Sequence, residues 1–525
     1  MMETSMRKLP VGLQSFEELR SKGYLYVDKT DMIWQLANSG TKYNYLSRPR
    51  RFGKSILVDT LQMYLEGRKE LFEGLKIMQL EKEWKHYPVI RLDLSGGGAS
   101  AFSLRSYLNM VFKEYELQYQ ITKGPEDSLA TRFDRIIKTA YQQSGLQVAI
   151  LIDEYDSPLQ HSWHTSEHEA CTSIYREVFA ILKMDDKYEK FVFITGITKF
   201  TQISLFSVLN NLTNISFFPE YASLCGITEA EITENFAPEM EKMGVKNHWD
   251  KLETHDRLKE YYDGYHFSDD NMVDIYNPFS LVHALSFSKL RNYWAASGAT
   301  SMLAKFVTDA EIKLGKFNNC RIMRNVLETS DVTGGGAELF LYQSGYLTIK
   351  DSDEFGYVLG FPNEEVKQAL YDMVLPALTL RQRDSVQSMQ ADLYYYLGTA
   401  QLDEAKKTMK SLIADVPYSN KKMASMDMEE RYRLIISTIL NAIGLQVEVE
   451  HMHAGGRIDI VAKTSYYIYV MELKLSNNGG VRAAEKLIFD QQYLEPFKAD
   501  KRKVIGLAVE LDKGGKGLID WKEMP

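Results

Sequence analysis

The sequence predicts an α/β fold with a parallel sheet in its first half, a largely helical middle and a smaller α/β domain at its C-terminal end. Strand-like runs at 42–47, 87–94, 147–152 and 191–197 are separated by helix-like segments. Parallel strands require such crossovers, and the crossover helices then cover both faces of the sheet. The region 417–525 reads as helix, strand, hairpin, helix and strand, which indicates a separate sheet.

The length indicates several domains, because a chain of 525 residues exceeds the size at which one hydrophobic core keeps growing. We expect a parallel-sheet domain over 1–228, a helical region over 229–328, a winged-helix-like and helical connector over 329–416, and the C-terminal domain over 417–525. Within the connector, a short helix followed by a hairpin resembles a winged-helix module. This module could pack on the first domain or bind nucleic acid. The polar segment Pro417–Ser425 is the expected linker.

Composition and charge narrow the class of protein. Hydrophobic residues make up 45% and charged residues 25%, so the chain is globular rather than disordered. The net charge of -9 argues against a basic coat over the whole molecule but leaves room for a local basic channel. The three cysteines lie far apart, and no apolar run approaches the roughly 18 residues of a membrane span. We therefore expect no disulfide framework, no signal peptide, no membrane partner and a reducing, cytoplasmic setting.

A candidate phosphate-binding loop follows the first strand-like run. The octet Arg48–Ser55 matches G-x-x-x-x-G-K-[ST], except that Arg48 stands at the first glycine position. Gly53 lets the backbone approach a phosphate, Lys54 can reach the β- and γ-phosphates, and the Ser55 hydroxyl can ligate Mg²⁺. An ordinary turn with an exposed lysine is the alternative. The expected nucleotide-binding residues of the loop are Arg50, Arg51, Phe52, Gly53, Lys54 and Ser55.

Two acids follow a later buried strand, where the apolar run Val148–Ile152 ends in Asp153 and Glu154. In P-loop ATPases the first such acid holds Mg²⁺, and an adjacent glutamate polarises the attacking water. Asp153 is therefore the expected metal ligand beside Ser55, and Glu154 the expected catalytic residue. Thr198, at the end of the next strand-like run, could sense the γ-phosphate. A solvated turn is the alternative for the acids, and a hydroxyl that satisfies a turn is the alternative for Thr198.

A second candidate site lies on a predicted hairpin near the C-terminal end. Two strand-like runs flank the turn Thr464–Tyr467. A symmetric turn places Asp459 opposite Glu472 on one face, and Lys474 points to that face too. Facing carboxylates repel unless a cation joins them, and hard oxygen ligands suit Mg²⁺ or Mn²⁺. The lysine would orient a water or stabilise charge on a scissile phosphate. Exposed ion pairs are the alternative, although apolar neighbours favour function.

The helix before this hairpin is expected to supply a further acid. Its apolar stripe includes Tyr432, Ile435 and Ile439, at helical spacing. Glu429 lies three residues before Tyr432, in phase with the stripe, whereas Glu430 falls nearer the other side. We therefore expect Glu429 to face the site. The alternative is an acid that complements the dipole at the start of the helix.

Several segments together resemble one bacterial family. They are Tyr26–Thr30, the arginine-rich loop Arg48–Ser55, Leu151–Pro158, Thr195–Phe200, Tyr262–Tyr265 and Asn277–Ser280. This combination is similar to the bacterial AAA-ATPase-like family, whose members often carry a C-terminal nuclease of the PD-(D/E)XK type. The resemblance implies a P-loop (RecA/AAA-like) parallel sheet, in which the usual ATPase roles fall to Lys54, Ser55, Asp153 and Glu154.

The resemblance also implies that the C-terminal domain is an α/β restriction-endonuclease-like fold. Asp459, Glu472 and Lys474 then take the motif positions of the nuclease. The family usually carries a glutamine on the following helix. At the corresponding spacing this chain has Leu487, with Gln491 and Gln492 nearby.

These observations predict a protein that binds and hydrolyses ATP and thereby regulates a Mg²⁺- or Mn²⁺-dependent nuclease. The expected substrate is DNA, RNA is a second option, and a homo-oligomer is compatible with the sequence. The alternative is a nucleotide-switched protein that binds nucleic acid or protein through an inactive nuclease fold. A third reading is an ATPase motor with a winged-helix arm, which would show strong DNA-stimulated hydrolysis.

Overall fold

The computed structural model describes residues 7–122, 127–199, 212–294, 319–329, 336–379, 383–414, 427–453 and 456–524. The chain divides into two compact units, one of residues 1–296 and 319–365 and one of residues 297–318 and 366–525. The boundary at Glu365 and Val366 falls inside the range expected to form one connector, and the four-part division stays a prediction. The expected linker at 417–425 lies outside the described residues.

The first unit is built on a parallel sheet with the strand order β2-β3-β4-β1-β5. Its strands are β1 (Tyr43–Ser47), β2 (Val89–Asp93), β3 (Val148–Asp153), β4 (Glu189–Gly196) and β5 (Thr213–Asn214). Because β4 lies between β1 and β3, the loop after β1 and the acids after β3 meet at one edge of the sheet, on either side of the end of β4. The expected parallel sheet is therefore present.

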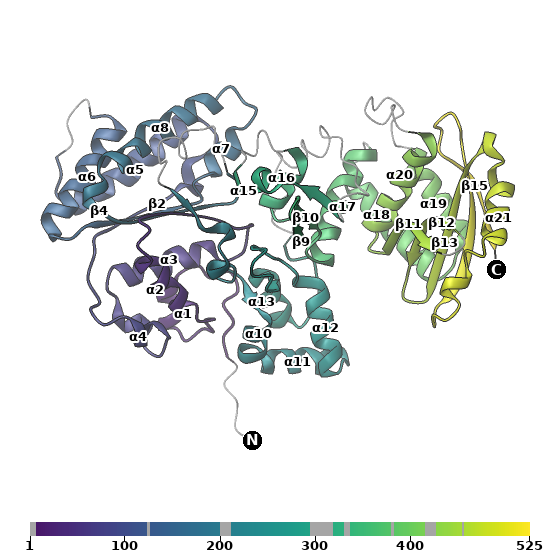
Figure 1. Ribbon diagram of the computed structural model, residues 1–525, viewed down its shortest axis with the longest axis horizontal. Coiled ribbons are helices and arrows are strands. Elements are labelled where there is room, and N and C mark those ends of the chain that lie inside the picture. Colours follow the sequence, from purple (N-terminus) through teal and green to yellow (C-terminus); the bar gives the residue numbers. More distant parts are fainter. Residues whose placement is uncertain are drawn as a thin grey trace, which may run out of the picture. The chain divides into compact units, whose positions relative to one another are not determined.

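Helices cover both faces of this sheet, with α5, α6 and α8 on one side and α2 and α3 on the other (Figure 1). The helices of this region are α1 (Phe16–Ser21), α2 (Thr30–Asn38), α3 (Lys54–Leu65), α4 (Ile77–Leu80), α5 (Ala101–Gln118), α6 (Leu129–Ser144), α7 (Ser157–Ser162) and α8 (His168–Met184). Across both units, the short 3-10 helices of the described residues are η1 (Lys69–Phe72), η2 (Leu94–Gly97), η3 (Asp186–Tyr188), η4 (Ile215–Phe217), η5 (Pro219–Tyr221), η9 (Ser476–Asn478) and η10 (Glu495–Phe497). Among the helices that the structure describes, none combines the length and apolarity of a membrane span.

A helical region continues the first unit. It comprises α10 (Glu229–Asn235), α11 (Ala237–Asn247), α12 (Lys251–Tyr262) and α13 (Pro278–Phe287), with a small antiparallel pair of β6 (Ile227–Thr228) and β7 (Ile275–Tyr276). Its core is apolar and is centred on Ile232, Met243, Leu258 and Leu281. The caps follow the sequence: Thr228 forms a capping box with Glu231, and Asn277 caps α13 ahead of Pro278.

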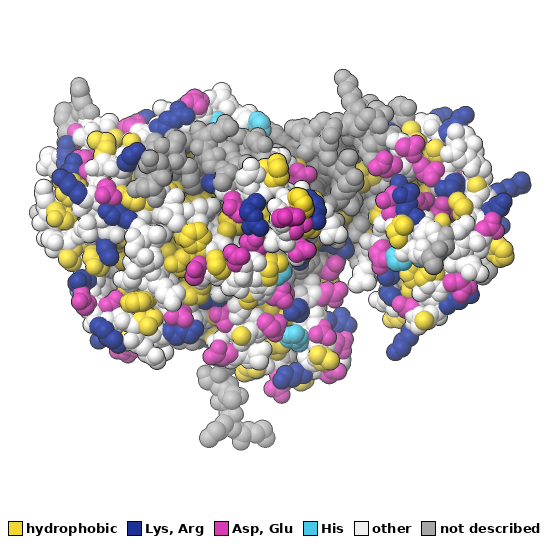
Figure 2. Space-filling model, viewed as in Figure 1, with side chains coloured by type: hydrophobic (Ala, Val, Ile, Leu, Met, Phe, Trp, Pro, Cys, Tyr) yellow, Lys and Arg dark blue, Asp and Glu magenta, His cyan; other side chains and the backbone are white. Residues whose placement is uncertain are grey.

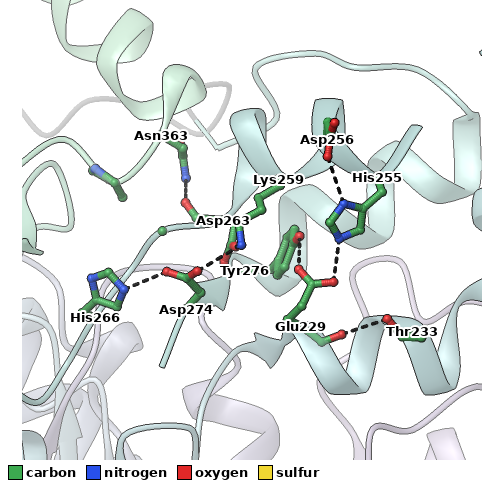
Figure 3. Close-up of polar contacts among 12 residues, drawn as sticks. Glu229, Thr233, His255, Asp256, Lys259, Asp263, His266, Asp274, Tyr276 and Asn363 are labelled. Atoms are coloured by element: carbon green, nitrogen blue, oxygen red, sulfur yellow. Dashed lines mark hydrogen bonds and ion pairs between the residues drawn. The ribbon is translucent and has the colours of Figure 1, made fainter. Parts of the chain in front are cut away.

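Partly buried polar side chains tie this region together (Figure 3). The Glu229 carboxylate accepts a hydrogen bond from the Tyr276 hydroxyl at 2.8 Å and lies 2.7 Å from Nε2 of His255. Asp274 in turn lies 2.8 Å from Nε2 of His266. These contacts join α10, α12 and β7 through groups that would each be costly to bury alone.

Asp263 is the deepest acid of this network, at 2% exposed, and neither of its oxygens has a hydrogen-bond partner among the described residues. Its nearest cation is Nζ of Lys259, at 3.6 Å. Burial raises the pKa of Asp263 to about 6. The Asp263 carbonyl accepts a hydrogen bond from Asn363, which fixes the start of the segment 263–267.

A smaller antiparallel sheet with the order β8-β10-β9 completes the first unit. Its elements are β8 (Cys320–Ile322), α15 (Arg324–Thr329), α16 (Gly336–Gln343), β9 (Thr348–Asp353) and β10 (Gly356–Gly360). The short helix and hairpin expected from the sequence are therefore present. The Tyr342 ring of α16 stacks on Phe217 at 6.1 Å, and Gln343 accepts a hydrogen bond from the Lys199 amide. The helix thus packs beside the carboxyl end of the large sheet.

The second unit contains a five-stranded mixed sheet in sequential order, in which β13 and β14 are parallel and the other pairs antiparallel. Its strands are β11 (Gln446–His453), β12 (Gly456–Lys463), β13 (Tyr467–Leu475), β14 (Lys503–Leu511) and β15 (Leu518–Met524). The helices are α17 (Glu364–Thr379), which crosses the unit boundary, and α18 (Arg383–Gly398), α19 (Leu402–Ala414), α20 (Met428–Ala442) and α21 (Gly480–Asp490). In Figure 1, α19 and α20 lie on one face of the sheet and α21 on the other.

We expect the ionisation of Asp263 to oppose folding. The folded protein binds a proton at this carboxyl more tightly than the unfolded chain does. The free-energy cost of burying Asp263 therefore shrinks as the pH falls from about 6 towards 4 and the carboxyl becomes protonated. Relative to Asp263→Asn, the wild type should gain up to about 3 kcal/mol in the free energy of unfolding across this window. Urea unfolding at pH 7 and pH 4.5 measures the difference. The exposed Asp270→Asn is the control, and parallel pH curves for wild type and Asp263→Asn would contradict the expectation.

Candidate nucleotide site and candidate nuclease site

The loop between β1 and α3 has the backbone form of a phosphate cradle. Gly53 has φ 85°, a left-handed conformation suited to glycine, and Arg51 has φ 66°, which is unusual for a side-chain-bearing residue. Lys54 Nζ donates to the carbonyls of Arg48 and Pro49 at 3.1 Å each. The lysine therefore points into the loop, where phosphate oxygens could replace those carbonyls.

Asp153 ends β3 beside this loop, almost fully buried. One of its oxygens accepts the Glu154 amide, and the other, Oδ2, has no hydrogen-bond partner among the described residues. Burial raises the pKa of Asp153, while a hydrogen bond with Ser55 and the charge of Lys54 oppose the rise. An unsatisfied buried carboxylate oxygen next to a hydroxyl fits a divalent cation, so Ser55 and Asp153 are suitable ligands for Mg²⁺.

Glu154 and Thr198 face the same edge of the sheet. Glu154 adopts φ 50°, and its carboxylate lies 3.9 Å from Lys54 Nζ. Burial raises the pKa of Glu154, and Lys54 counteracts this. The Thr198 hydroxyl donates to Asp156 Oδ2 at 2.6 Å and accepts from Gln160. The positive φ of Glu154 strains its backbone, and such strain is typical of functional positions.

Asp156 was not singled out from the sequence. Its Oδ2 atom accepts hydrogen bonds from the amides of Ile197 and Thr198 as well as from the Thr198 hydroxyl. It thereby holds the end of β4 against the loop that follows β3. The signal was available, because a third acid follows Asp153 and Glu154 within the resembling segment Leu151–Pro158.

Arg48, which replaces the first glycine of the motif, points its side chain away from the cradle. Its guanidinium is buried and donates to the carbonyls of Ser216 and Tyr221. It also lies over the Phe267 ring at 4.1 Å. In the described part of the chain no carboxylate forms an ion pair with it, and burial lowers its pKa. The arginine thus anchors the start of the loop without filling the phosphate space.

The neighbouring loop residues differ in what they can offer a nucleotide. Arg51 stacks on Phe279 at 3.7 Å and donates to the Tyr293 carbonyl, and Arg50 lies 3.3 Å from Gln160. Phe52 is fully buried, so its side chain belongs to the core, and only its backbone is available to a phosphate.

The Phe52 ring packs edge-on against Tyr265 at 4.7 Å and Phe267 at 5.3 Å. These rings come from the segment 263–267, which the hydrogen bond from Asn363 to the Asp263 carbonyl and the contact between His266 and Asp274 hold in place. The phosphate cradle is therefore braced from behind by the helical region.

The hairpin near the C-terminal end has the register that the sequence predicted. Ile460 pairs with Met471, and one further step along both strands places Asp459 opposite Glu472. Both acids are buried, at 6% and 4% exposed. Asp459 Oδ2 accepts the Leu473 amide at 2.9 Å. The two carboxylates therefore lie together in the sheet and not on an exposed surface hairpin.

Lys474 and Glu429 join this pair as expected. Lys474 Nζ lies 3.0 Å from Glu472 Oε1 and 3.0 Å from Glu429 Oε1. The lysine therefore bridges β13 to the first turn of α20. Glu430 is exposed, as the helical phase predicted.

The electrostatics of this cluster favour a bound cation. Glu472 Oε2 is buried without a hydrogen-bond partner among the described residues. Burial raises the pKa of Glu472 to about 7, and Asp459 raises it further while Lys474 lowers it. Within the described chain no group of three His, Cys, Asp or Glu side chains forms a metal centre. Two carboxylates with an unsatisfied oxygen still fit a divalent ion that retains waters, as Mg²⁺ does.

Arg433 is a member of the cluster that was missed. Its Nη1 atom lies 2.7 Å from Asp459 Oδ1. Arg433 follows Glu429 by four residues, and side chains at this spacing share one face of a helix. Helical phase could therefore have identified it once Glu429 was placed.

The fold and the two sites define a protein that joins a P-loop ATPase-like domain to a nuclease-like domain. Residues 10–206 match the family model described as a predicted AAA-ATPase, and residues 427–521 match the PD-(D/E)XK nuclease superfamily. The chain therefore carries both domains, and the predicted fold class and family resemblance are confirmed. A protein of Azotobacter chroococcum mcd 1, described as an uncharacterized protein in the vnfD 5' region, is 29% identical over 528 residues. The match covers 98% of this chain and 99% of that protein.

Gly345, just after α16, should be essential for the shape of the phosphate loop. It has φ 87°, and a β-carbon there would lie 2.5 Å from Cβ of Pro49. We expect Gly345→Ala to displace Pro49 and to weaken nucleotide binding about tenfold, because such overpacking costs about 1–3 kcal/mol. Titration with a fluorescent ATP analogue measures this affinity.

Gly40→Ala is the matched control, since Gly40 has φ 86° with open space around it. Both variants suffer the same backbone strain of about 1 kcal/mol, but only Gly345→Ala presses on the loop. Equal nucleotide affinities for the two variants would contradict the expected role of Gly345.

Proposed function

We propose that this protein binds and hydrolyses ATP and that its nucleotide state regulates a divalent-metal-dependent nuclease acting on DNA. The observation that carries the proposal is the cluster of Asp459, Glu472 and Lys474, in which a buried Glu472 oxygen lacks a partner. A buried anion of this kind is costly unless a cation completes it. The matches to both domain families support ATPase and nuclease roles.

In the nucleotide site, Lys54 and the amides at the start of α3 would bind the phosphates. Ser55 and Asp153 would hold Mg²⁺, which neutralises charge on the transferred phosphoryl group. Glu154 would accept a proton from the attacking water, and burial raises the pKa of its carboxyl. Asp156 holds the Thr198 hydroxyl at 2.6 Å, and Thr198 would sense the γ-phosphate.

In the nuclease site, Asp459 and Glu472 would hold the divalent cation. When bound, the cation supplies an activated water and a counter-charge for the scissile phosphate. Lys474 would orient that water and stabilise charge in the transition state. Glu429 holds the Lys474 ammonium in place at 3.0 Å. Lys474 and Glu429 thus provide positioning that does not depend on the cation.

DNA remains the proposed substrate, with RNA as a second option and a homo-oligomer as a compatible assembly. On the face shown in Figure 2, basic and acidic side chains are interspersed over the described residues rather than gathered in one basic field. Such a surface favours local contacts to a few phosphates over broad electrostatic binding. The packing of α16 within the first unit weighs against a winged-helix motor, because that helix is taken up by Phe217 and Lys199.

The second candidate is a nucleotide-switched binding or signalling protein with an inactive nuclease fold. The ion pair between Arg433 and Asp459 favours it, since a cationic side chain occupies one oxygen of a proposed metal ligand. Calorimetry with Mn²⁺ separates the candidates, because an inactive site should take up no metal that depends on Asp459.

Replacement of the nuclease residues should abolish cutting without affecting nucleotide binding. We expect Asp459→Ala and Lys474→Ala to lower Mg²⁺-dependent cleavage of DNA by at least about a hundredfold, as loss of metal and charge stabilisation implies. ATP affinity should stay unchanged. Glu495→Ala, at an exposed ion pair with Lys498, is the control. Cleavage by either site variant at the wild-type rate would disprove the nuclease assignment.

Replacement of the ATPase residues should separate binding from turnover. Lys54→Ala should lose ATP binding, whereas Glu154→Gln should bind ATP and hydrolyse it about 100–10,000 times more slowly, the usual range for loss of a general base. Because nucleotide state is proposed to regulate cutting, the two variants should differ in DNA cleavage. Identical cleavage by both, with and without ATP, would remove the regulatory part of the proposal.

A further inference from the structure

The start of α20 presents two oppositely charged side chains, one helical turn apart, to the proposed metal site. Glu429 contacts Lys474, and Arg433 contacts Asp459. Each buried acid of the site thereby has its own basic partner, Lys474 for Glu472 and Arg433 for Asp459. The arrangement neutralises carboxylates that would otherwise repel each other across the strands.

Arg433 also has a second acidic neighbour. Its Nη2 atom lies 3.3 Å from Glu450 Oε1, and Glu450 is half-exposed and contacts Arg457 at 3.1 Å. In β11, Glu450 falls between the residues that pair with Ile460 and Ile458, and it thus stands at the register position opposite Asp459. Glu450 has φ 57°, which marks a local irregularity of this strand. The guanidinium therefore bridges a buried acid and a more exposed acid on adjacent strands.

We propose that Arg433 is a positioning residue that competes with the divalent cation for Asp459, and that Glu450 receives Arg433 when the cation binds. This inference rests on the proposed nuclease function and adds to it a determinant of metal affinity. An arginine stays charged at any physiological pH, so it cannot leave the site by losing its proton. A dication on Asp459 must therefore displace it to another partner, and Glu450 is already in contact.

The competition follows from the hydrogen bonds that the two Asp459 oxygens accept. Oδ2 accepts a hydrogen bond from the Leu473 amide, and Oδ1 accepts one from Arg433 at 2.7 Å. Coordination through Oδ1 replaces the arginine contact, and the two cations also repel each other at this separation. A purely structural Arg433 that only fastens α20 to the sheet would behave differently, because its loss would disorder Asp459 and weaken metal binding.

The test is isothermal calorimetry of Mn²⁺ binding to the full chain at fixed ionic strength. We expect Arg433→Gln to tighten the Mn²⁺ dissociation constant about tenfold, which is about 1.4 kcal/mol, because the variant loses the charged hydrogen bond that competes for Asp459. Arg433→Lys should stay within about threefold of wild type, because the charge remains. Glu450→Gln should weaken Mn²⁺ binding severalfold by removing the alternative partner of Arg433.

Arg457→Gln is the matched control. It removes one positive charge that also contacts Glu450 but has no ion pair with Asp459 among the described residues. It should change the dissociation constant less than about twofold, because exposed ion pairs contribute little. Thermal unfolding checks that each variant is folded. If Arg433→Gln does not fold, Glu450→Gln tests the proposal alone. Weaker Mn²⁺ binding by Glu450→Gln supports it, and unchanged or tighter binding overturns it.

Two failures remain distinguishable. If wild type binds no Mn²⁺, or if Asp459→Asn binds Mn²⁺ as well as wild type does, the proposed nuclease function itself is wrong. If wild type binds Mn²⁺ through Asp459 but Arg433→Gln binds it equally or more weakly, only the competitive role of Arg433 is overturned. An unchanged or tighter constant for Glu450→Gln would also overturn the role assigned to Glu450.

Discussion

Both candidate sites depend on one constraint, which is that a carboxylate removed from water needs a positive charge beside it. Asp153, Asp459 and Glu472 end or line buried strands where solvent cannot stabilise them. The charge of Lys54 acts on Asp153, and Arg433 and Lys474 form ion pairs with Asp459 and Glu472. A metal ion improves on each of these partners, because it offers more charge at shorter range. Both proposed metal sites therefore contain acids whose charge the chain already balances in part.

The order of the strands makes the first of these sites possible. With β4 between β1 and β3, the lysine of the loop and the two acids after β3 sit on either side of the end of β4. Asp156 then links the ends of β3 and β4 through the amides of Ile197 and Thr198. Gln343 of α16 accepts a hydrogen bond from the amide of the residue after Thr198, and Gly345, just after α16, leaves no room for a β-carbon beside Pro49 of the loop. A movement of the phosphate loop would therefore be transmitted directly to α16, which lies outside the nucleotide site.

Much of the fold and of both sites could be predicted from the sequence because their signals are local. Apolar runs ending in polar residues predicted β1, β3 and β4. The symmetry of one turn predicted the register of β12 and β13, in which Ile460 pairs with Met471, one step from Asp459 and Glu472. The rest depended on tertiary packing. Phe52 lies next to Gly53 in the motif, yet its ring is in the core because Tyr265 and Phe267 return to meet it from more than two hundred residues away. Arg433 was missed because apolar residues alone were used to phase α20.

The aromatic brace behind the phosphate loop has a consequence for how such proteins can be altered. The Phe52 ring packs edge-on against Phe267, and the Arg48 guanidinium lies over the same ring. A glycine-rich loop would have no side chains to fill this space. A loop grafted from another ATPase would leave a hole under the cradle, even if every phosphate contact were copied. A functional exchange of the phosphate loop between ATPases would thus have to transfer the segment 263–267 together with the loop.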